Sequence, residues 1–333
     1  MPARLTIHFP SRPARVLLLP DSREAVVGRG PECDVVVDDD RVSRRHAVLS
    51  PQGSGWTVTD LASKNGTLVD GMPVASGARE ELDERSWLSF GGLIACCETL
   101  EGSIERIEEE RLRRVTTSLE VRRGLDPRLG LAELLPRVVG SMLELTNGER
   151  GFLLLTSPDG GLEVAARSGL SPTDLEAEEF GGSRGAVERT LATGCPVVCT
   201  DTCAHAELGE RASVIATGIR ALLCVPVHAL DRVIGVLYAD SRKPGAAFTE
   251  LDLDILEALA AQAGLAIAVA RLDEELKGLA DRIVGSPGAD PGLRARLAGE
   301  VSAILDRSLR AAPPTFEWPG VFAASAPPLR AAS

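Results

Sequence analysis

Aromatic side chains are scarce in this chain, at 3% of its 333 residues. That scarcity excludes the base-stacking platform that single-stranded nucleic acids require. Basic residues are also outnumbered, with 36 Lys and Arg against 48 Asp and Glu, and the formal net charge is -12 at pH 7. The sequence contains no helix-turn-helix or zinc-finger signature, and no basic block stands apart from balancing glutamates. We therefore expect no nucleic-acid partner.

Long hydrophobic runs are missing as well. The first residues have no apolar core of signal-peptide length, and the longest apolar stretch, residues 258–270, is interrupted by Gln262. A hydrophobic content of 44% is still enough for real cores, and the length suggests about two domains. We expect a cytoplasmic protein that does not contact a membrane.

The cysteine count is seven, an odd number without a disulfide framework, so we expect reduced and mostly buried thiols. Cys195, Cys199, Cys203 and His205 lie close enough in sequence to be drawn as metal ligands. A metal or redox role is disfavoured, because structural zinc prefers two-residue gaps and residues 196–199 predict a strand whose side chains alternate in direction.

Three polar clusters occur in the first seventy residues: Gly28-Arg29, Ser43-Arg44-Arg45-His46 and Ser63-Lys64-Asn65-Gly66-Thr67. Runs of strand-forming residues surround them, at 26–27, 35–37, 47–49, 56–58 and 67–69. Each cluster therefore falls in a predicted turn, and turns at one end of a β-sandwich would bring the clusters together. Their guanidinium, ammonium, hydroxyl and amide groups suit the binding of a phosphorylated side chain.

Residues 5 to about 100 resemble a forkhead-associated (FHA) domain, a phosphothreonine-binding β-sandwich, in the ordered motifs Gly-Arg, Ser-x-x-His and Asn-Gly-Thr. The resemblance implies that Arg29 and Ser43 hold the phosphate, and that Arg44 and Lys64 add donors beside it. It also implies that Asn65 holds the ligand's backbone and that Arg41 contacts a residue downstream of the phosphothreonine. The residues with a structural role in such a site are Gly28, His46, Gly66 and Thr67. Of these, His46 orients the loop without touching the ligand.

Residues 101–125 differ in composition from the preceding strands, with many glutamates and arginines, and predict a linker helix. Its narrow apolar stripe consists of Ile104, Ile107, Leu112, Val115 and Leu119. Glutamates four residues before arginines, as in Glu109 with Arg113, stabilise the helix on its solvent-exposed face. Either the stripe forms a two-helix seam, or the helix packs on its own domain, and the stripe is too short to decide.

Residues 126–284 predict an α+β domain. With this second core, the chain is expected to be a multidomain protein. We expect a helix through 131–143, a hairpin of 151–155 with 162–167, a strand at 196–199 and a second hairpin of 221–227 with 233–238. A long helix follows from Thr249, at 249–284. Residues 218–227 and 234–240, with Phe248 and Asp252, resemble a GAF domain. This implies an antiparallel sheet with flanking helices.

The resemblance does not carry over to the ligands of known GAF domains. Cyclic-nucleotide-binding members pair Asn-Lys with a downstream Phe-x-x-x-Asp-Glu, whereas here Arg242 precedes Lys243 and Leu253 replaces the glutamate. Bilin-binding members need a cysteine beside a histidine, and no Cys-His dipeptide occurs. No known cofactor is expected. An unidentified small ligand and a purely structural, dimerising role both remain open.

The helices at 101–123 and 249–284 resemble signalling helices of bacterial regulators, and pairing them across a homodimer would connect the two domains. Residues 285–310 predict an amphipathic helix, and residues 311–333 a disordered tail rich in proline and alanine. Phe316, Trp318 and Phe322 interrupt that tail, either as a docking motif or as a segment that folds back.

A serine hydrolase pattern, Gly-x-Ser-x-Gly, occurs at residues 181–185, with Asp201 and His205 or His228 downstream. The nucleophile elbow needs a buried strand before the serine, but residues 176–180 are largely acidic. Ser183 is better explained as the N-cap of a helix that ends at Gly194. We expect that the chain is not an enzyme.

The sequence thus favours a non-catalytic bacterial signalling adaptor. Its first domain would bind a phosphothreonine protein, either a Ser/Thr kinase or a kinase substrate, and its second would sense a ligand or dimerise. Similar domain pairs precede the ATPase of enhancer-binding transcription activators. The alternatives are a constitutive dimeric scaffold, or an accessory regulator of such an activator, without phosphopeptide binding. A hydrolase that uses Ser183 is less favoured.

Overall fold

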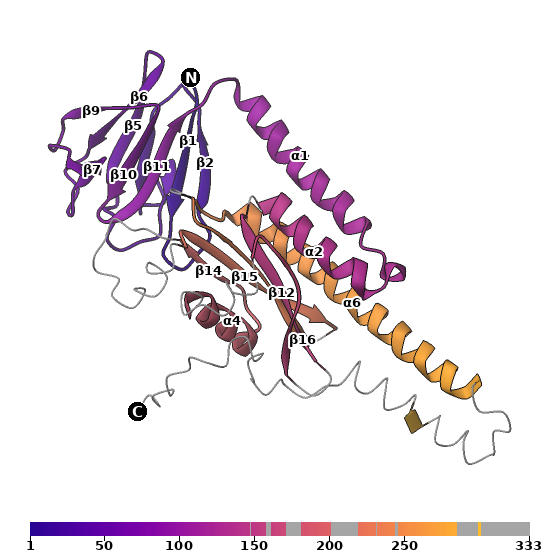
Figure 1. The fold of residues 1–333 in the computed structure, drawn as a ribbon. Coiled ribbons are helices and arrows are strands. Elements are labelled where there is room, and N and C mark those ends of the chain that lie inside the picture. Colours follow the sequence, from indigo (N-terminus) through magenta and orange to yellow (C-terminus); the bar gives the residue numbers. More distant parts are fainter. Residues whose placement is uncertain are drawn as a thin grey trace, which may run out of the picture. The chain divides into compact units, whose positions relative to one another are not determined.

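The computed structural model describes residues 1–146, 148–157, 161–170, 181–200, 219–230, 232–243, 246–284 and 299–300 (Figure 1). These residues form two compact units, and the main boundary between them follows Thr116. The first unit contains the predicted β-sandwich, and the second contains a separate sheet with its helices.

The first unit consists of two sheets. Their strands are β1 (Ala3–His8), β2 (Arg15–Leu19), β3 (Ala25–Gly28), β4 (Val35–Val36), β5 (Ala47–Gln52), β6 (Gly55–Asp60), β7 (Thr67–Val69), β8 (Met72–Pro73), β9 (Arg79–Leu82), β10 (Arg85–Phe90) and β11 (Leu93–Thr99). One sheet has the order β2-β1-β11-β10-β7-β8 and the other β4-β3-β5-β6-β9. Neighbours pair antiparallel apart from the parallel pair β3 and β4.

The sandwich core forms because inward-facing side chains alternate along the strands. In β1, Leu5 and Ile7 are fully buried, and in β5 the same is true of Ala47 and Leu49. Trp56 is buried as well, and its indole N–H donates a hydrogen bond to the carbonyl of Met1 at 2.9 Å. The five predicted runs fall in β3 to β7, whereas β1, β2 and β8 to β11 lie outside them.

The second unit begins within α1 (Ile104–Arg123). Its further elements are η1 (Pro127–Leu129), α2 (Leu131–Thr146), β12 (Arg150–Thr156), β13 (Leu162–Ser168), α4 (Gly181–Thr193), β14 (Val197–Thr200), β15 (Ala221–Ala229), β16 (Arg232–Ser241) and α6 (Glu250–Val284). The sheet order is β13-β12-β16-β15-β14, and α2 packs on β12 and β13. Figure 1 shows α2 and α6 along one face of this sheet and α4 along the other.

Close packing and one buried ion pair hold the second unit together. A Cβ on Gly264 of α6 would overlap the carbonyl of His228 in β15, so glycine permits the close approach of helix and strand. Arg150 and Asp240 form a bidentate pair across β12 and β16, at 2.7 and 2.8 Å. Phe152 and Tyr238 stack beside it with ring centroids 4.6 Å apart.

The residues 250–278 of α6 are long and apolar enough to span a membrane by length and composition, despite the interruption at Gln262. Half of the most apolar part of this helix is buried inside the protein. The buried residues include Leu256, Leu259 and Ile267. A helix that packs its apolar face on a sheet can be as long and as apolar as a membrane-spanning helix. Packing against the sheet explains the apolar composition of α6.

One predicted boundary was wrong. The helix α4 begins at Gly181, so Ser183 lies in its first turn and is not the N-cap. Glycine can adopt helical backbone angles, so Gly181-Gly182 did not delay the start of the helix. Residues 176–180, the segments 285–298 and 301–310, and the tail 311–333 lie outside the described residues, as do Asp201 and His205.

Candidate functional site

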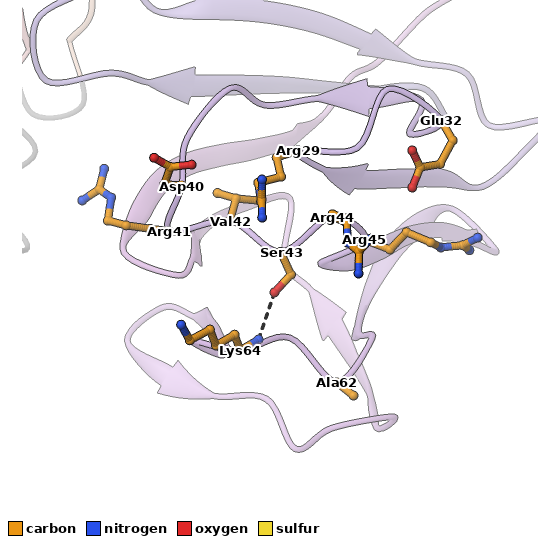
Figure 2. Close-up of a pocket in the computed structure, with 10 residues that line it drawn as sticks. All are labelled: Arg29, Glu32, Asp40, Arg41, Val42, Ser43, Arg44, Arg45, Ala62 and Lys64. Atoms are coloured by element: carbon orange, nitrogen blue, oxygen red, sulfur yellow. Dashed lines mark hydrogen bonds between the residues drawn. The ribbon is translucent and has the colours of Figure 1, made fainter.

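The three polar clusters meet at one end of the sandwich. The first follows β3, the second precedes β5, and the third connects β6 to β7. Together they line an open groove of about 580 Å³ (Figure 2). Five basic side chains line it, from Arg29, Arg41, Arg44, Arg45 and Lys64, and two acidic ones, from Glu32 and Asp40.

Ser43 occupies the middle of this groove. Its hydroxyl oxygen accepts a hydrogen bond from the backbone N–H of Lys64 at 2.9 Å, drawn as a dashed line in Figure 2. The hydroxyl proton is therefore free to donate to a ligand. The Ser43 carbonyl accepts from the backbone N–H of Arg29 at 3.0 Å. Backbone bonds thus bring all three clusters into contact at this serine.

Four of the basic side chains have no counter-ion. Arg29, Arg44, Arg45 and Lys64 are exposed, and none of their side chains makes an ion pair or hydrogen bond with the described part of the chain. Figure 2 shows Arg29 directed toward Ser43, whereas Arg45 points away from it. Uncompensated cations in a groove attract an anion, and guanidinium groups match the geometry of phosphate oxygens.

Arg41 differs from these four because Asp39 already binds it. Its Nε lies 3.0 Å and its Nη2 2.8 Å from the two carboxylate oxygens of Asp39, and its backbone N–H donates to the same group at 2.9 Å. These hydrogen bonds lower the pKa of Asp39. In Figure 2 the guanidinium points away from Ser43. A contact of Arg41 with a residue downstream of the phosphothreonine stays a prediction.

Asn65 holds the loop that carries Arg41. Its Nδ2 donates to the Arg41 carbonyl at 2.8 Å. An amide has a second N–H and an acceptor oxygen, which remain for a ligand's backbone. Gly91 approaches the same carbonyl, where a Cβ would overlap it, and its φ of +60° is also in the region that favours glycine. The loop position therefore depends on both residues.

His46 is buried behind the groove and links two of its loops. Its Nδ1 accepts from the backbone N–H of Ser43 at 3.0 Å, and its Nε2 lies 3.1 Å from the carbonyl of Gly66. These partners fix a neutral ring with the proton on Nε2. Burial lowers the pKa of His46, and this effect outweighs the hydrogen bond to Gly66 and the charge of Asp60. The side chain is fully buried, so it cannot contact a ligand without rearrangement.

Asp60 shapes the third cluster. Its carboxylate accepts hydrogen bonds from the backbone N–H and hydroxyl of Ser63, at 3.0 and 2.6 Å, and from the hydroxyl of Thr67 at 2.7 Å. Burial alone would raise the pKa of Asp60, but these bonds leave it lowered. The sequence motifs did not include Asp60, although aspartate is a common turn-forming residue.

Gly28 is needed because two segments cross closely at the end of β3. A Cβ there would overlap the carbonyl oxygen of Arg44. That oxygen accepts hydrogen bonds from the backbone N–H of Gly30 at 2.9 Å and from the thiol of Cys33 at 3.0 Å. Both hydrogen bonds at this crossing are accepted by the main-chain carbonyl of Arg44, so its side chain stays available.

None of the cysteines in the described residues forms a disulfide, and Cys195 is exposed and Cys199 partly buried. Within the same residues, no group of three or more His, Cys, Asp or Glu side chains is placed to hold a metal ion. The two other members of the cluster considered as metal ligands, Cys203 and His205, lie outside the described residues.

The first unit is thus a β-sandwich with uncompensated cations on its end loops, and the second is an antiparallel sheet with packed helices. The comparison with family models agrees. The FHA domain model matches residues 25–91, and the GAF domain model matches residues 130–267. The chain carries these two domains in that order.

Individual relatives match one part of the chain each. Over 58 residues it is 41% identical to the FHA domain-containing protein FhaB of Mycolicibacterium smegmatis, which covers 17% of this chain and 37% of that protein. Over 142 residues it is 30% identical to the Nif-specific regulatory protein of Sinorhizobium fredii, covering 42% of this chain and 24% of that protein. The chain thus spans about a third and a quarter of these relatives.

Among solved structures, Mycobacterium tuberculosis EmbR in complex with a low affinity phosphopeptide aligns with 30% of this chain and 25% of that one. The sequence identity is 23% and the TM-score 0.25.

Proposed function

We propose that this protein is a non-catalytic signalling adaptor whose FHA domain binds a phosphothreonine protein. One observation carries the proposal: four basic side chains without a counter-ion among the described residues line the groove in which the Ser43 hydroxyl proton is free to donate. A phosphothreonine brings close to two negative charges and three acceptor oxygens, which such a groove would satisfy. The partner would be a Ser/Thr kinase or a kinase substrate in the cytoplasm.

Within this groove the residues would divide the work. Arg29 and Ser43 would bind the phosphate oxygens, and Arg44 and Lys64 would add donors beside them. Asn65 would hold the ligand's main chain with the amide atoms that its bond to the Arg41 carbonyl leaves available.

The second part of the proposal concerns the GAF domain and the helices beside it. In α1, Leu112, Val115 and Leu119 are exposed, and in α6, Leu265, Val269 and Leu276 are exposed as well. Gaps of three and four residues in α1, and of four and seven in α6, place each set on one helix face, the pattern of a two-helix seam. We propose that these faces pair across a homodimer and that the domain senses a small ligand or only dimerises. The α1 helix would then act as a signalling linker.

The resemblance to the Nif-specific regulatory protein supports a second candidate function. It extends over 142 residues at 30% identity, more of this chain than the match to FhaB covers. In that case the chain would be an accessory regulator of a transcription activator, or a dimeric scaffold, and would bind no phosphopeptide.

A phosphopeptide binding experiment distinguishes these functions. The full chain would be incubated with a library of phosphothreonine peptides and with matched phosphoserine and threonine peptides, and affinities would be measured for the retained sequences. Arg29→Ala should weaken binding at least tenfold, because each charge-assisted hydrogen bond contributes ~1.5–3 kcal/mol. Arg4→Ala is the matched control, because Arg4 lies away from the groove. It pairs with Glu98 at one end of β11, whereas Gly91, which contacts the groove loop, precedes the other end.

Two results would contradict the adaptor function. One is equal binding of phosphothreonine, phosphoserine and threonine peptides by the wild type. The other is equal affinity of the wild type and Arg29→Ala. Either result would favour the scaffold or the accessory regulator.

A further inference from the structure

Two carboxylates flank the basic centre of the groove. Glu32 belongs to the loop between β3 and β4, and Asp40 to the loop between β4 and β5. Figure 2 shows them on opposite sides of Ser43. Both side chains are exposed, and neither makes a hydrogen bond or ion pair with the described residues. They are therefore open charges, unlike the neighbouring Asp39, which is occupied by Arg41.

The charges of the groove are close to balanced once a phosphate is bound. Four uncompensated cations face the two open carboxylates, and a phosphate dianion offsets most of the remaining positive charge. An acidic peptide side chain beside the phosphate would then meet carboxylates with little free positive charge left. A Lys or Arg side chain in the same place would meet an unpaired carboxylate.

Arg41 does not change this balance. An acidic ligand side chain could reach its guanidinium only by competing with the two hydrogen bonds that the guanidinium donates to Asp39, at 2.8 and 3.0 Å. Asp39 is well placed to keep its partner, because it also accepts the backbone N–H of Arg41.

We infer that the groove selects phosphothreonine peptides that carry Lys or Arg near the phosphothreonine, with Asp40 and Glu32 as the residues that determine this specificity. This inference rests on the proposed function, because it assigns the sequence around the phosphate and not the phosphate itself. Each carboxylate reads one flank of the peptide, since the two lie on opposite sides of the phosphate position.

The test uses the full chain and synthetic phosphothreonine peptides that differ at one flanking position, with Lys, Ala or Glu in that place. Fluorescence anisotropy at low salt should show Lys peptides binding ~2–5-fold more tightly than Ala peptides, and Glu peptides more weakly still, as for exposed charge pairs. The preference should shrink as the salt concentration rises.

Charge reversal identifies the residues. Asp40→Lys should reverse the preference at one flank and Glu32→Lys at the other. Glu84→Lys is the matched control, because Glu84 is exposed and its carbonyl pairs with Thr99, away from the groove. It should leave all preferences as in the wild type. Circular dichroism of each variant checks that the exposed substitution preserves the fold.

The failures are distinct. If the wild type binds no phosphothreonine peptide, the proposed function is wrong and this inference falls with it. If it binds them with equal affinity whether Lys or Glu flanks the phosphate, or if both charge reversals keep the wild-type preference, only the inference about flanking residues is overturned.

Discussion

The backbone N–H of Lys64 donates a hydrogen bond to the hydroxyl oxygen of Ser43, and so joins loops that are 21 residues apart in the sequence. Ser43 therefore has two tasks that one atom group performs. Its oxygen holds the third cluster of the groove, and its proton is left available for the proposed ligand.

Replacing Ser43 by alanine removes both tasks. We expect Ser43→Ala to weaken phosphothreonine-peptide binding about tenfold, since a hydrogen bond to a charged group contributes ~1.5–3 kcal/mol. Isothermal titration calorimetry would measure the affinity. Ser54→Ala, in the turn between β5 and β6, is the matched control and should bind as the wild type does. An unchanged affinity of Ser43→Ala would exclude the serine from the phosphate site.

His8 should make the stability of the first unit depend on pH. Its side chain is buried, and its ring centroid lies 5.4 Å from that of Trp87. Its Nε2 has no hydrogen-bond partner in the described residues. Burial, and then the charge of Arg85, lower the pKa of His8 to about 4. The unfolded chain titrates near the ordinary value of 6.5, so below it the unfolded state binds more protons. The free energy of unfolding should therefore fall as the pH falls from 6.5 toward 4.

The expected loss from His8 is roughly 3 kcal/mol over that range, at 1.36 kcal/mol per pKa unit. His8→Phe keeps an aromatic ring beside Trp87 and should flatten the pH dependence, with a smaller slope left from His46. Urea unfolding, followed by tryptophan fluorescence at several pH values, measures this. The same substitution at His228, in the second unit, serves as the control. An unaltered slope in His8→Phe would contradict the assignment.

The buried pair of Arg150 and Asp240 should be the most sensitive point of the second unit. Side-chain exposure is 10% for the arginine and 0% for the aspartate. Arg150→Met leaves a buried carboxylate without its partner, which should destabilise the unit by ~3–5 kcal/mol.

Combining Arg150→Met with Asp240→Leu should recover much of this loss, because it also removes the isolated charge. Chemical denaturation of the single and double variants measures the coupling. The exposed pair of Lys277 and Asp273 is the control, and Lys277→Met should leave the free energy of unfolding nearly unchanged. Equal stability of Arg150→Met and the wild type would mean that the pair is unimportant.

The proposed dimer can be tested on α6. Leu265→Glu combined with Val269→Glu places two like charges at the exposed apolar face, so we expect the dimer to dissociate into monomers of half the mass. Analytical ultracentrifugation reads this directly. Leu230→Glu makes the same chemical change on an exposed leucine in the turn after β15 and should not alter the mass. A monomeric wild type would refute the dimer.

The sequence predicted some of this structure because the signals were local. Short runs of strand-forming residues marked β3 to β7, and the polar clusters between them marked the turns that meet at the groove. Other features depend on three-dimensional placement. Asp39 and Arg41 are two residues apart, and only the bend of the loop lets their side chains form a bidentate pair. Their sequence therefore gave no indication that Arg41 would differ from Arg29.

The sheet order was also beyond local signals. Strands β1 and β11 pair although they lie at opposite ends of the first domain's sequence, with Ala3 opposite Thr99. Such pairing is determined by how the whole core packs. The roles of the groove residues in binding stay predictions, because geometry shows which groups are available and not what occupies them.

The three hydrogen bonds that Asp60 accepts have a consequence for the thermodynamics of recognition. They arise within the folded domain, so the shape of the loop through Ser63 to Thr67 does not wait for a ligand. The groove is preorganised, and little conformational entropy remains to be lost on association. Free and bound forms should superpose closely at this loop, and the association rate should be governed by long-range attraction between the unpaired cations and the phosphate.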